Sequence, residues 1–377
     1  MNQSVSRPLE GLRVIELARV LAGPWCGQLL ADLGAEVIKI ERPEVGDDTR
    51  HWGPPFVTGA AGEDLGAAYY HSCNRGKRSI AIDIATGAGQ TALRELLADA
   101  DVVIENYKVG GLAKYGLDPA RLRADFPQLI VCSVTGFGQT GPYAHRAGYD
   151  YIVQAMSGFM SLTGEPDGPP QKAGIAYADI FTGLYSTVAI LAALRRRDVM
   201  GAGAHIDMAL LDSQVAVLAN QAANYLASGV VPKRMGSGHA NVVPYQVFAT
   251  ADGQLVIAVG NDSQYRKLCT ILGMPEWGTD PRFATNAARL ENRSTLIPML
   301  AAKIAAWDAQ PLSLALEAEG VPAGPINDLA GVFADPQVVA RGMRFRPEGA
   351  AIDAVASPIV IDGERMIAAR GAPPLGE

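Results

Sequence analysis

The sequence lacks the short motifs that mark the commonest catalytic centres. It contains no HExxH, no Walker A loop and no GxSxG nucleophile elbow. Its five histidines, at positions 51, 71, 145, 205 and 239, show no metal-ligand spacing. We therefore expect no metal site, and no zinc-protease, P-loop or serine-hydrolase chemistry.

Cysteine and long apolar runs are also scarce. The four cysteines lie far apart and form no CxxC pair, which is typical of free thiols in a reducing compartment. No apolar run reaches about 18 residues, and residues 1–10 have no hydrophobic signal core. We expect a cytoplasmic protein without a membrane-spanning helix.

Positive charge is in deficit, because the formal net charge is −7. An acidic chain is a poor general partner for nucleic acids, so we expect small-molecule partners and no nucleic-acid or membrane partner. A polyanionic ligand would have to be met by a local group of basic side chains.

The first half of the chain alternates between strand and helix patterns. Strands are predicted at 13–17 and 36–40 around a helix at 22–33, and further strands at 79–84, 101–104 and 129–134. This alternation predicts an open α/β sheet with parallel strands. The first turn lacks GxGxxG, which argues against a nicotinamide site, although Glu41 stands where such folds keep a ribose-binding acid. A GxGxxG match at 136–141 precedes Pro142 and polar residues, so we interpret it as accidental.

The pattern changes after about residue 200. One long helix is predicted at 208–227, followed by a hairpin of strands at 245–249 and 254–259. The remaining predictions are helices at 149–162, 263–272, 287–306 and 312–319, and a turn at 320–325. At 377 residues the chain exceeds one core, so a second, smaller α+β domain is expected.

Asp179 is the most informative single residue. It lies among small and apolar residues at 173–183, just before an apolar helix pattern. One interpretation is a helix N-cap, for which aspartate is common. The other is a carboxylate nucleophile, which is ionised at neutral pH and needs no activating base. The local sequence leaves both interpretations open.

Several stretches together resemble the class III CoA-transferase family. This family includes formyl-CoA, carnitine and succinyl-CoA–dicarboxylate CoA-transferases and the α-methylacyl-CoA racemases. The resemblance covers nearly the whole chain and is carried by Pro8-Leu-Glu-Gly-Leu12, Leu21-Ala-Gly-Pro24, Leu33-Gly-Ala-Glu-Val-Ile-Lys-Ile-Glu-Arg42, Gly46-Asp-Asp-Thr-Arg50, Lys77-Arg-Ser-Ile80, Glu105-Asn-Tyr107, Arg146-Ala-Gly-Tyr-Asp150 and Gly320-Val-Pro-Ala-Gly-Pro325. Within the family, residues 19–24, 46–56 and 243–246 are most similar to succinyl-CoA–glutarate CoA-transferases.

The resemblance implies the fold and the assembly. The fold would be α/β, with a Rossmann-like large domain and an inserted smaller α+β domain. We expect the large domain at 1–205, a linker helix at 206–228, the small domain at 229–325 and a return segment at 326–377. Two chains would form an intertwined homodimer of interlocked rings.

The resemblance also implies the site residues. Asp179 falls on the family's nucleophile, which would form a mixed anhydride and then an aspartyl-CoA thioester. The residues on the family's CoA-contacting positions are Val20, Leu21, Ala22, Arg42, Ile82, Asn106, Tyr107, Lys114, Tyr149 and Asp150. The residues expected to contact the acyl group or the carboxylate are Arg19, Gly236, Ser237, Gly238 and His239. Coenzyme A would act as a substrate, with no tightly bound cofactor.

The function that this resemblance implies is the transfer of CoA from succinyl-CoA to a short dicarboxylate such as glutarate. Three alternatives stay open: a racemase, a formyl-CoA or carnitine type of transferase, and a catalytically silent CoA-binding protein. The racemase branch has a histidine where this chain has Tyr149, and tyrosine, which is protonated at neutral pH, is a poor base. Transfer is therefore the favoured interpretation.

Overall fold

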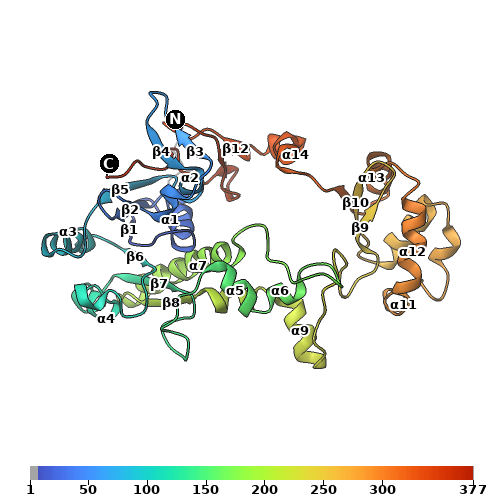
Figure 1. Ribbon diagram of the computed structural model, residues 1–377, viewed down its shortest axis with the longest axis horizontal. Helices are drawn as coiled ribbons and strands as arrows, with labels where there is room; N and C mark the ends of the chain where they lie inside the picture. Colours follow the sequence, from blue (N-terminus) through green and yellow to red (C-terminus); the bar gives the residue numbers. More distant parts are fainter. Residues whose placement is uncertain (1–6, 377) are drawn as a thin grey trace. The chain divides into compact units, whose positions relative to one another are not determined.

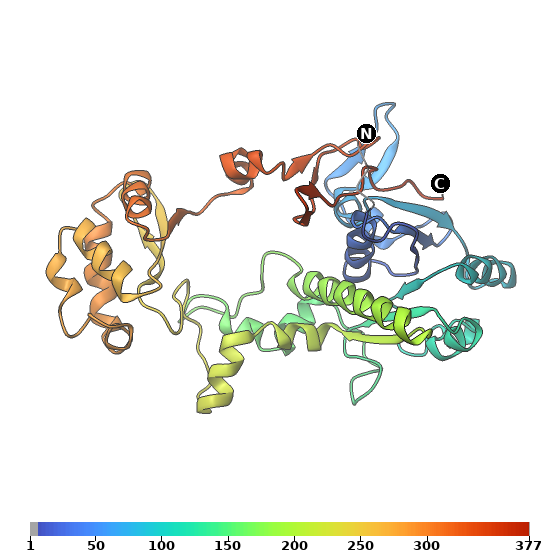
Figure 2. The ribbon, with the colours of Figure 1, turned by 180° about the vertical axis from the view of Figure 1, so that it is seen from behind.

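The computed structural model describes residues 7–376, which form two compact units (Figure 1 and Figure 2). Within the described residues, unit 1 comprises Met1–Phe159, Lys172–Leu218 and Asp335–Glu377, and unit 2 comprises Met160–Gln171 and Ala219–Ala334. These bounds differ from the expected ones, because unit 2 begins earlier, ends later and includes the short segment Met160–Gln171. Unit 1 contains both ends of the described chain.

A parallel sheet of six strands forms the centre of unit 1. Its spatial order is β5-β2-β1-β6-β7-β8. This is the 3-2-1-4-5-6 order of doubly wound dinucleotide-binding folds, with its switch point between β1 and β6. The expected open parallel sheet is thus confirmed. Its strands are β1 (Arg13–Glu16), β2 (Glu36–Glu41), β5 (Lys77–Ala81), β6 (Val102–Glu105), β7 (Ile130–Thr135) and β8 (His205–Ala209).

Alternating apolar residues bury both faces of this sheet. Val14, Val37 and Ile130 join one core cluster, and their neighbours Ile15, Ile38 and Val131 join another on the opposite face. The helices contributing to the first cluster are α1 (Ala22–Asp32), α5 (Asp150–Met156), α7 (Tyr177–Met200) and α8 (Leu210–Ala216). Those contributing to the second are α3 (Gly87–Ala98) and α4 (Pro119–Asp125).

Helix α7 is long and apolar enough to cross a membrane by length and composition alone. Half of its most apolar stretch is nevertheless buried inside the protein, where Ile190 and Leu194 pack in the core with α1. A core helix of a globular domain passes the same test, and we interpret α7 as one.

The predicted long helix at 208–227 is wrong, and with it the linker helix expected at 206–228. His205–Ala209 forms β8, the edge strand beside β7, and the chain then forms α8 and, after a break at residues 217–218, α9 (Ala219–Ser228). Two other predicted helices are interrupted. Gly158, with a φ of 90°, separates α5 from α6 (Phe159–Leu162), and Asn292 separates α11 (Asn286–Glu291) from α12 (Arg293–Ile304).

Unit 2 contains a small antiparallel sheet in the order β11-β10-β9, formed by β9 (Tyr245–Ala249), β10 (Gln254–Ala258) and β11 (Ala323–Pro325). The predicted hairpin is confirmed, whereas the last part of the predicted turn at 320–325 is a strand. Leu255, Leu268, Leu300 and Leu316 join one apolar core from the sheet and three helices. The further helices of unit 2 are α10 (Asp262–Ile271), α13 (Ala309–Ala318) and α14 (Leu329–Ala334).

The remaining elements are short. They are β3 (Phe56–Thr58), β4 (Asp64–Ala67), α2 (Ala68–Cys73), α15 (Pro336–Ala340), β12 (Arg344–Phe345), β13 (Ala354–Val355), β14 (Val360–Ile361) and β15 (Glu364–Arg365), with 3-10 turns at Asp48–His51, Ala113–Tyr115 and Pro275–Gly278. The C-terminal segment packs on unit 1, where Gly376 donates its N–H to Ser79 on β5 at 3.1 Å.

Candidate active site

A cavity of about 640 Å³ opens at the carboxyl ends of the strands in unit 1. Arg19 to Ala22 follow β1, Asn106 and Tyr107 follow β6, Gly136 follows β7, and Leu210 follows β8, and all of them line it. Asp179, in the first turn of α7, also reaches it. Ligands of doubly wound sheets bind at this position, beside the switch point.

The loop after β1 is held by its backbone. Arg19 donates its N–H to the Asn106 side chain at 3.0 Å, and the amide of Asn106 donates back to the Arg19 carbonyl at 2.7 Å. Val20 has a φ of 73°, which is uncommon for a β-branched residue, and its N–H is accepted by Asp47 at 3.2 Å. The loop is thus tied to β6 on one side and to the loop after β2 on the other.

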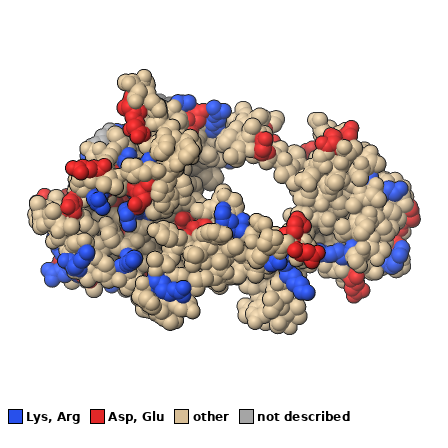
Figure 3. All heavy atoms as spheres, in the orientation of Figure 1, with Lys and Arg blue, Asp and Glu red and all other residues tan. Residues whose placement is uncertain are grey.

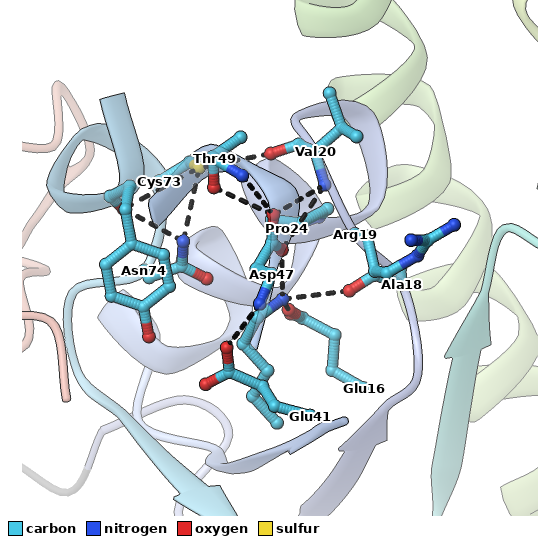
Figure 4. Close-up of polar contacts among 12 residues, drawn as sticks. Glu16, Ala18, Arg19, Val20, Pro24, Glu41, Asp47, Thr49, Cys73 and Asn74 are labelled. Carbon is cyan, nitrogen blue, oxygen red and sulfur yellow. Dashed lines mark hydrogen bonds and ion pairs between the residues drawn. The ribbon is translucent and has the colours of Figure 1, made fainter. Parts of the chain in front are cut away.

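Asp47 belongs to a group of six buried charged side chains behind this loop, which we term the buried charge cluster. Figure 4 shows Asp47 between Glu41, Thr49 and the backbone of Val20. Lys39 lies 2.9 Å from both Asp47 and Glu16, and its ammonium also donates to the Ala18 carbonyl at 2.8 Å. The cluster consists of Glu16, Lys39, Glu41, Asp47, Arg50 and Lys77.

The other members of the cluster complete its charge balance. Lys77 lies 2.8 Å from Glu16, and Arg50 binds Glu41 with two nitrogens at 2.9 and 2.7 Å. Burial opposes the charge on Lys39, but the adjacent carboxylates Glu16 and Asp47 outweigh it and raise its pKa above the ordinary lysine value. The carboxylate of Glu41 is therefore held by Arg50.

Helix α1 passes directly over this cluster. A Cβ atom at Gly27 would stand 1.9 Å from a carboxylate oxygen of Glu16. Only glycine fits there without moving the ion pairs, so the helix and the cluster fix each other's position.

Asp179 is half-buried, and its carboxylate has no hydrogen-bond or ion-pair partner among residues 7–376. Burial, with a smaller contribution from the negative charge of Asp150, raises the pKa of Asp179 to about 7. Asp150 lies at the start of α5 and accepts two N–H groups from the first turn of α7. The structure therefore assigns the capping of α7 to Asp150, and Asp179 is left facing the cavity.

The cavity wall is basic although the protein is acidic. On the face drawn in Figure 3, acidic and basic side chains are interspersed. Along the cavity, however, Asp179 is the single carboxylate among the described lining residues, against four cations: Arg19, Lys108, Lys114 and Arg146. Such a cavity suits a ligand carrying several phosphate charges. Lys108 and Arg146 were not among the residues expected to contact CoA, although Lys108 adjoins the Glu105-Asn-Tyr107 stretch and Arg146 begins another matching stretch.

A second cavity of about 560 Å³ adjoins the first and shares Arg19, Tyr107 and Tyr115 with it. Arg42 and Ile82 line it. The structure thus brings the expected CoA-contacting residues to two neighbouring cavities, except that Asp150 lines neither and instead bonds to α7. Ala85 also lines the second cavity.

Arg19 already has a partner, because its guanidinium lies 2.8 Å from Asp48. Both side chains are about half exposed, so the pair is open to competition from a ligand carboxylate.

The glycine-rich loop Gly236 to His239 lies in unit 2. Arg293 donates to the His239 carbonyl at 2.6 Å, and Gly236 donates its N–H to the Gly164 carbonyl at 3.0 Å. Ser237 accepts the N–H of Val247 at 3.2 Å. The loop is therefore anchored to the rest of unit 2 rather than free.

All four cysteines are free and buried, and the described residues contain no group of three His, Cys, Asp or Glu side chains that could hold a metal ion.

Comparison with known proteins gives consistent matches. The sequence profile of CoA-transferase family III matches residues 9–377. The chain is 58% identical to a succinate–glutarate CoA-transferase of Agrobacterium fabrum, over 98% of this chain and 93% of the relative. It is 43% identical to the human succinyl-CoA:glutarate CoA-transferase, over 98% of this chain and 84% of the relative.

Solved structures agree. A CAIB/BAIF family protein from Brucella suis is 57% identical, with a TM-score of 0.87, over 98% of this chain and 96% of the other. A hypothetical protein from Mycobacterium tuberculosis is 31% identical, also with a TM-score of 0.87, over 98% of both chains.

The raised pKa of Asp179 predicts a pH-dependent effect on stability. The folded chain keeps this proton over a pH range where the unfolded chain has lost it. The contribution of the Asp179 proton to the free energy of unfolding is therefore fully present below about pH 4 and is lost as the pH rises through about 7. Asparagine does not ionise. Asp179→Asn should therefore be more stable than the parent by about 1–3 kcal/mol near pH 8, with the difference vanishing toward pH 4.

Urea unfolding across this pH range measures the effect. Asp198→Asn, which removes an exposed carboxylate from the same helix, is the matched control. A constant difference between Asp179→Asn and the parent at all pH values would show that Asp179 ionises normally.

Proposed function

The chain belongs to CoA-transferase family III and is a CoA-transferase, and on that premise we propose that it transfers coenzyme A from succinyl-CoA to glutarate through Asp179. The observation that carries this proposal is a single partner-free carboxylate in a cavity whose other charged lining residues, among those described, are all cations. The similarity to relatives named succinate–glutarate and succinyl-CoA:glutarate CoA-transferases supports the substrate pair.

The proposed reaction has four steps, and each is an exchange at an acyl carbon. An oxygen of Asp179 attacks the thioester carbon of succinyl-CoA, and the C–S bond breaks. CoA departs as the thiolate, and a mixed anhydride between Asp179 and the succinyl group remains. The thiolate then attacks the carboxyl carbon of Asp179 and releases succinate. Glutarate attacks this aspartyl thioester and releases the thiolate, which finally attacks the glutaryl carbon and restores Asp179 as a carboxylate.

Once Asp179 is ionised, no proton is gained or lost in this sequence, so a general base is not required; the raised pKa makes that ionisation less complete at neutral pH than the sequence alone predicted. A reaction without a general base agrees with the absence of a histidine among the described residues lining the cavity, and with Tyr149 at the position where the racemase branch has a histidine. The anhydrides would hydrolyse in water, so the acyl site has to exclude it. We propose, from the family resemblance, that Gly236, Ser237, Gly238 and His239 contact the acyl group.

The two cavities of unit 1 supply a path for CoA as substrate. Lys108, Lys114 and Arg146 can bind its phosphates, while Arg42 and Ile82 lie in the neighbouring cavity proposed for the adenine end. Arg19 lies on the wall between them. We also propose a cytoplasmic location, which the four buried free thiols support and which cell fractionation tests.

Replacement of the nucleophile gives the direct test of the mechanism. Asp179→Asn and Asp179→Ala should lose at least about a thousandfold in transfer rate while remaining folded, because the covalent route is removed. Mass spectrometry of the parent incubated with succinyl-CoA should locate CoA, or its hydroxylamine cleavage product, on the peptide containing residue 179. Near-normal turnover by Asp179→Ala would refute the mechanism.

Arg19 is the proposed ligand of the second carboxylate of glutarate. The guanidinium fork suits a carboxylate, and its exposed pair with Asp48 can exchange for a ligand. Arg19→Ala should weaken kcat/KM for glutarate by about 1.5–3 kcal/mol and affect the KM of succinyl-CoA less. Asp48→Asn, which frees Arg19, should lower the KM for glutarate.

Arg78→Ala is the control, since Arg78 also forms an exposed ion pair in unit 1 and its side chain has the same 52% exposure as Arg19. If Arg19→Ala left the preference for diacids over monocarboxylates unchanged, this assignment would fail although the transferase activity stood.

We propose an intertwined homodimer, as the family resemblance implies. Large apolar side chains are exposed on helices of both units, as expected of surfaces that another chain covers. They include Tyr151, Ile152, Leu184, Tyr185 and Val188 in unit 1 and Tyr225 and Leu226 in unit 2. Sedimentation should give twice the chain mass of 39.7 kDa, and a stable monomer would refute the proposal.

A further inference from the structure

The first turn of α7, which carries Asp179, has no cap of its own. Ala176 occupies the N-cap position and offers no side-chain acceptor. Four N–H groups at a helix start need partners outside the regular helical pattern. Tyr177 donates to the Ile175 carbonyl at 2.9 Å, outside that pattern. Ile180 donates to the Ala176 carbonyl at 3.1 Å, which is the first regular bond of the helix. The two N–H groups between them belong to Ala178 and Asp179.

Asp150 accepts both of these groups. Its Oδ1 lies 2.7 Å from the nitrogen of Ala178 and 3.2 Å from that of Asp179. Asp150 stands 29 residues earlier in the chain, on α5, so the cap is a tertiary contact that joins two helices.

The second oxygen of Asp150 is held from its own helix. Gln154 Nε2 donates to Asp150 Oδ2 at 2.6 Å, and Gln154 Oε1 accepts the N–H of Ala173 at 2.9 Å. Gln154 is fully buried. A continuous chain of bonds therefore runs from Ala173 through Gln154 and Asp150 to the first turn of α7, and it fixes the segment before the nucleophile at both ends.

This arrangement separates the roles of two neighbouring carboxylates. Asp150 takes the N–H groups that would otherwise lower the energy of a carboxylate at the helix start. None of these N–H groups is bonded to the side chain of Asp179. A carboxylate deprived of donors is more basic, and a more basic oxygen is the better nucleophile toward a thioester carbon.

We propose that Asp150 is a positioning residue of the transfer reaction: it fixes the first turn of α7, withholds the helix N–H groups from Asp179 and places a negative charge beside it, so that the nucleophile faces the cavity basic and without a protein partner. This inference rests on the proposed function of Asp179. It replaces the expectation that Asp150 contacts CoA. The raised pKa of Asp179, to which burial and then Asp150 contribute, is consistent with it.

Other charged and titratable groups lie on the same cavity wall or are influenced by Asp179. Tyr69, on α2, is electrostatically coupled to it: burial first, and then the charge of Asp179, raise the pKa of this phenol. The further titratable or charged groups on the same cavity wall are Arg19, Tyr107, Lys108, Lys114, Tyr115, Arg146 and Tyr149. None of these residues is itself changed in Asp150→Asn, so we attribute a change in the titration of Asp179 to the lost charge of Asp150.

The test is the pH profile of Asp150→Asn. The amide oxygen can still accept from α7, but the negative charge is gone. The acid limb of kcat/KM should move to lower pH by about one unit, and the rate on the alkaline plateau should fall about threefold to tenfold as Asp179 becomes less basic. Asp150→Ala, which removes the cap as well, should lose more than about tenfold at every pH, because the nucleophile is no longer held.

Asp335→Ala is the matched control. Asp335 caps α15 in unit 1 with the same pattern, accepting from Gln337 at 2.8 Å and from Val338 at 3.1 Å. It should cost similar stability without moving the acid limb. An acid limb that stays in place in Asp150→Asn, or that moves equally in Asp335→Ala, would overturn the proposal.

A readout independent of turnover keeps this test separate from the proposed function. The stability difference between the parent and Asp179→Asn depends on pH, and this dependence should shift to lower pH when Asp150→Asn is added to both proteins. That shift can be measured even if glutarate is not the acceptor. Its absence would overturn the proposal by showing that Asp150 acts only as a structural cap.

Discussion

The buried charge cluster determines the shape of the cavity wall. Three cations and three carboxylates, all nearly inaccessible, hold the loops after β1 and β2 together beneath α1. Burying such charges is costly unless each is paired, and removing one member of a buried pair commonly costs about 3–5 kcal/mol. The cluster therefore cannot relax gradually. Because Asp47 is held in the cluster and accepts the N–H of Val20, it fixes Val20 in its unusual backbone conformation at the cavity edge.

The charge of the cavity wall depends on which carboxylates are paired with other residues and which are not. Most carboxylates behind the cavity are bound to arginine or lysine, so the basic side chains on its wall, apart from Arg19 with its partner Asp48, are left to face the ligand. Asp150 and Asp179 illustrate the same division at short range. Asp150 makes three hydrogen bonds and serves the backbone, whereas the carboxylate of Asp179 makes none with the described residues and is available for chemistry. Their environments, rather than their residue type, give them different roles.

Much of unit 1 could be predicted from local sequence, because strands such as β1, β2 and β7 alternate between two buried faces. His205–Ala209 could not, since its half-buried pattern arises only from pairing with β7 at the sheet edge. Asp179 was predicted through the family resemblance, because its local sequence fits a helix cap equally well. The actual cap comes from Asp150 through a tertiary contact, and the partner of Glu41 is Arg50 nine residues away. Both contacts depend on how the loops bring separate segments together, and the pattern of apolar residues along the sequence does not reveal this.

The partner-free state of Asp179 is what double displacement requires. In the proposed sequence the same carboxyl group acts as nucleophile, then as electrophile, and finally as leaving group. A strong permanent hydrogen bond would favour the free carboxylate over the later acyl forms and would have to break at each turnover. Instead, the backbone of the site is held in place: Asp150 bonds the first turn of α7, and the Arg19–Asn106 pair bonds the loop after β1 on the same cavity wall. The side chain is then positioned without being bound, and the substrate supplies its interaction partners at each step.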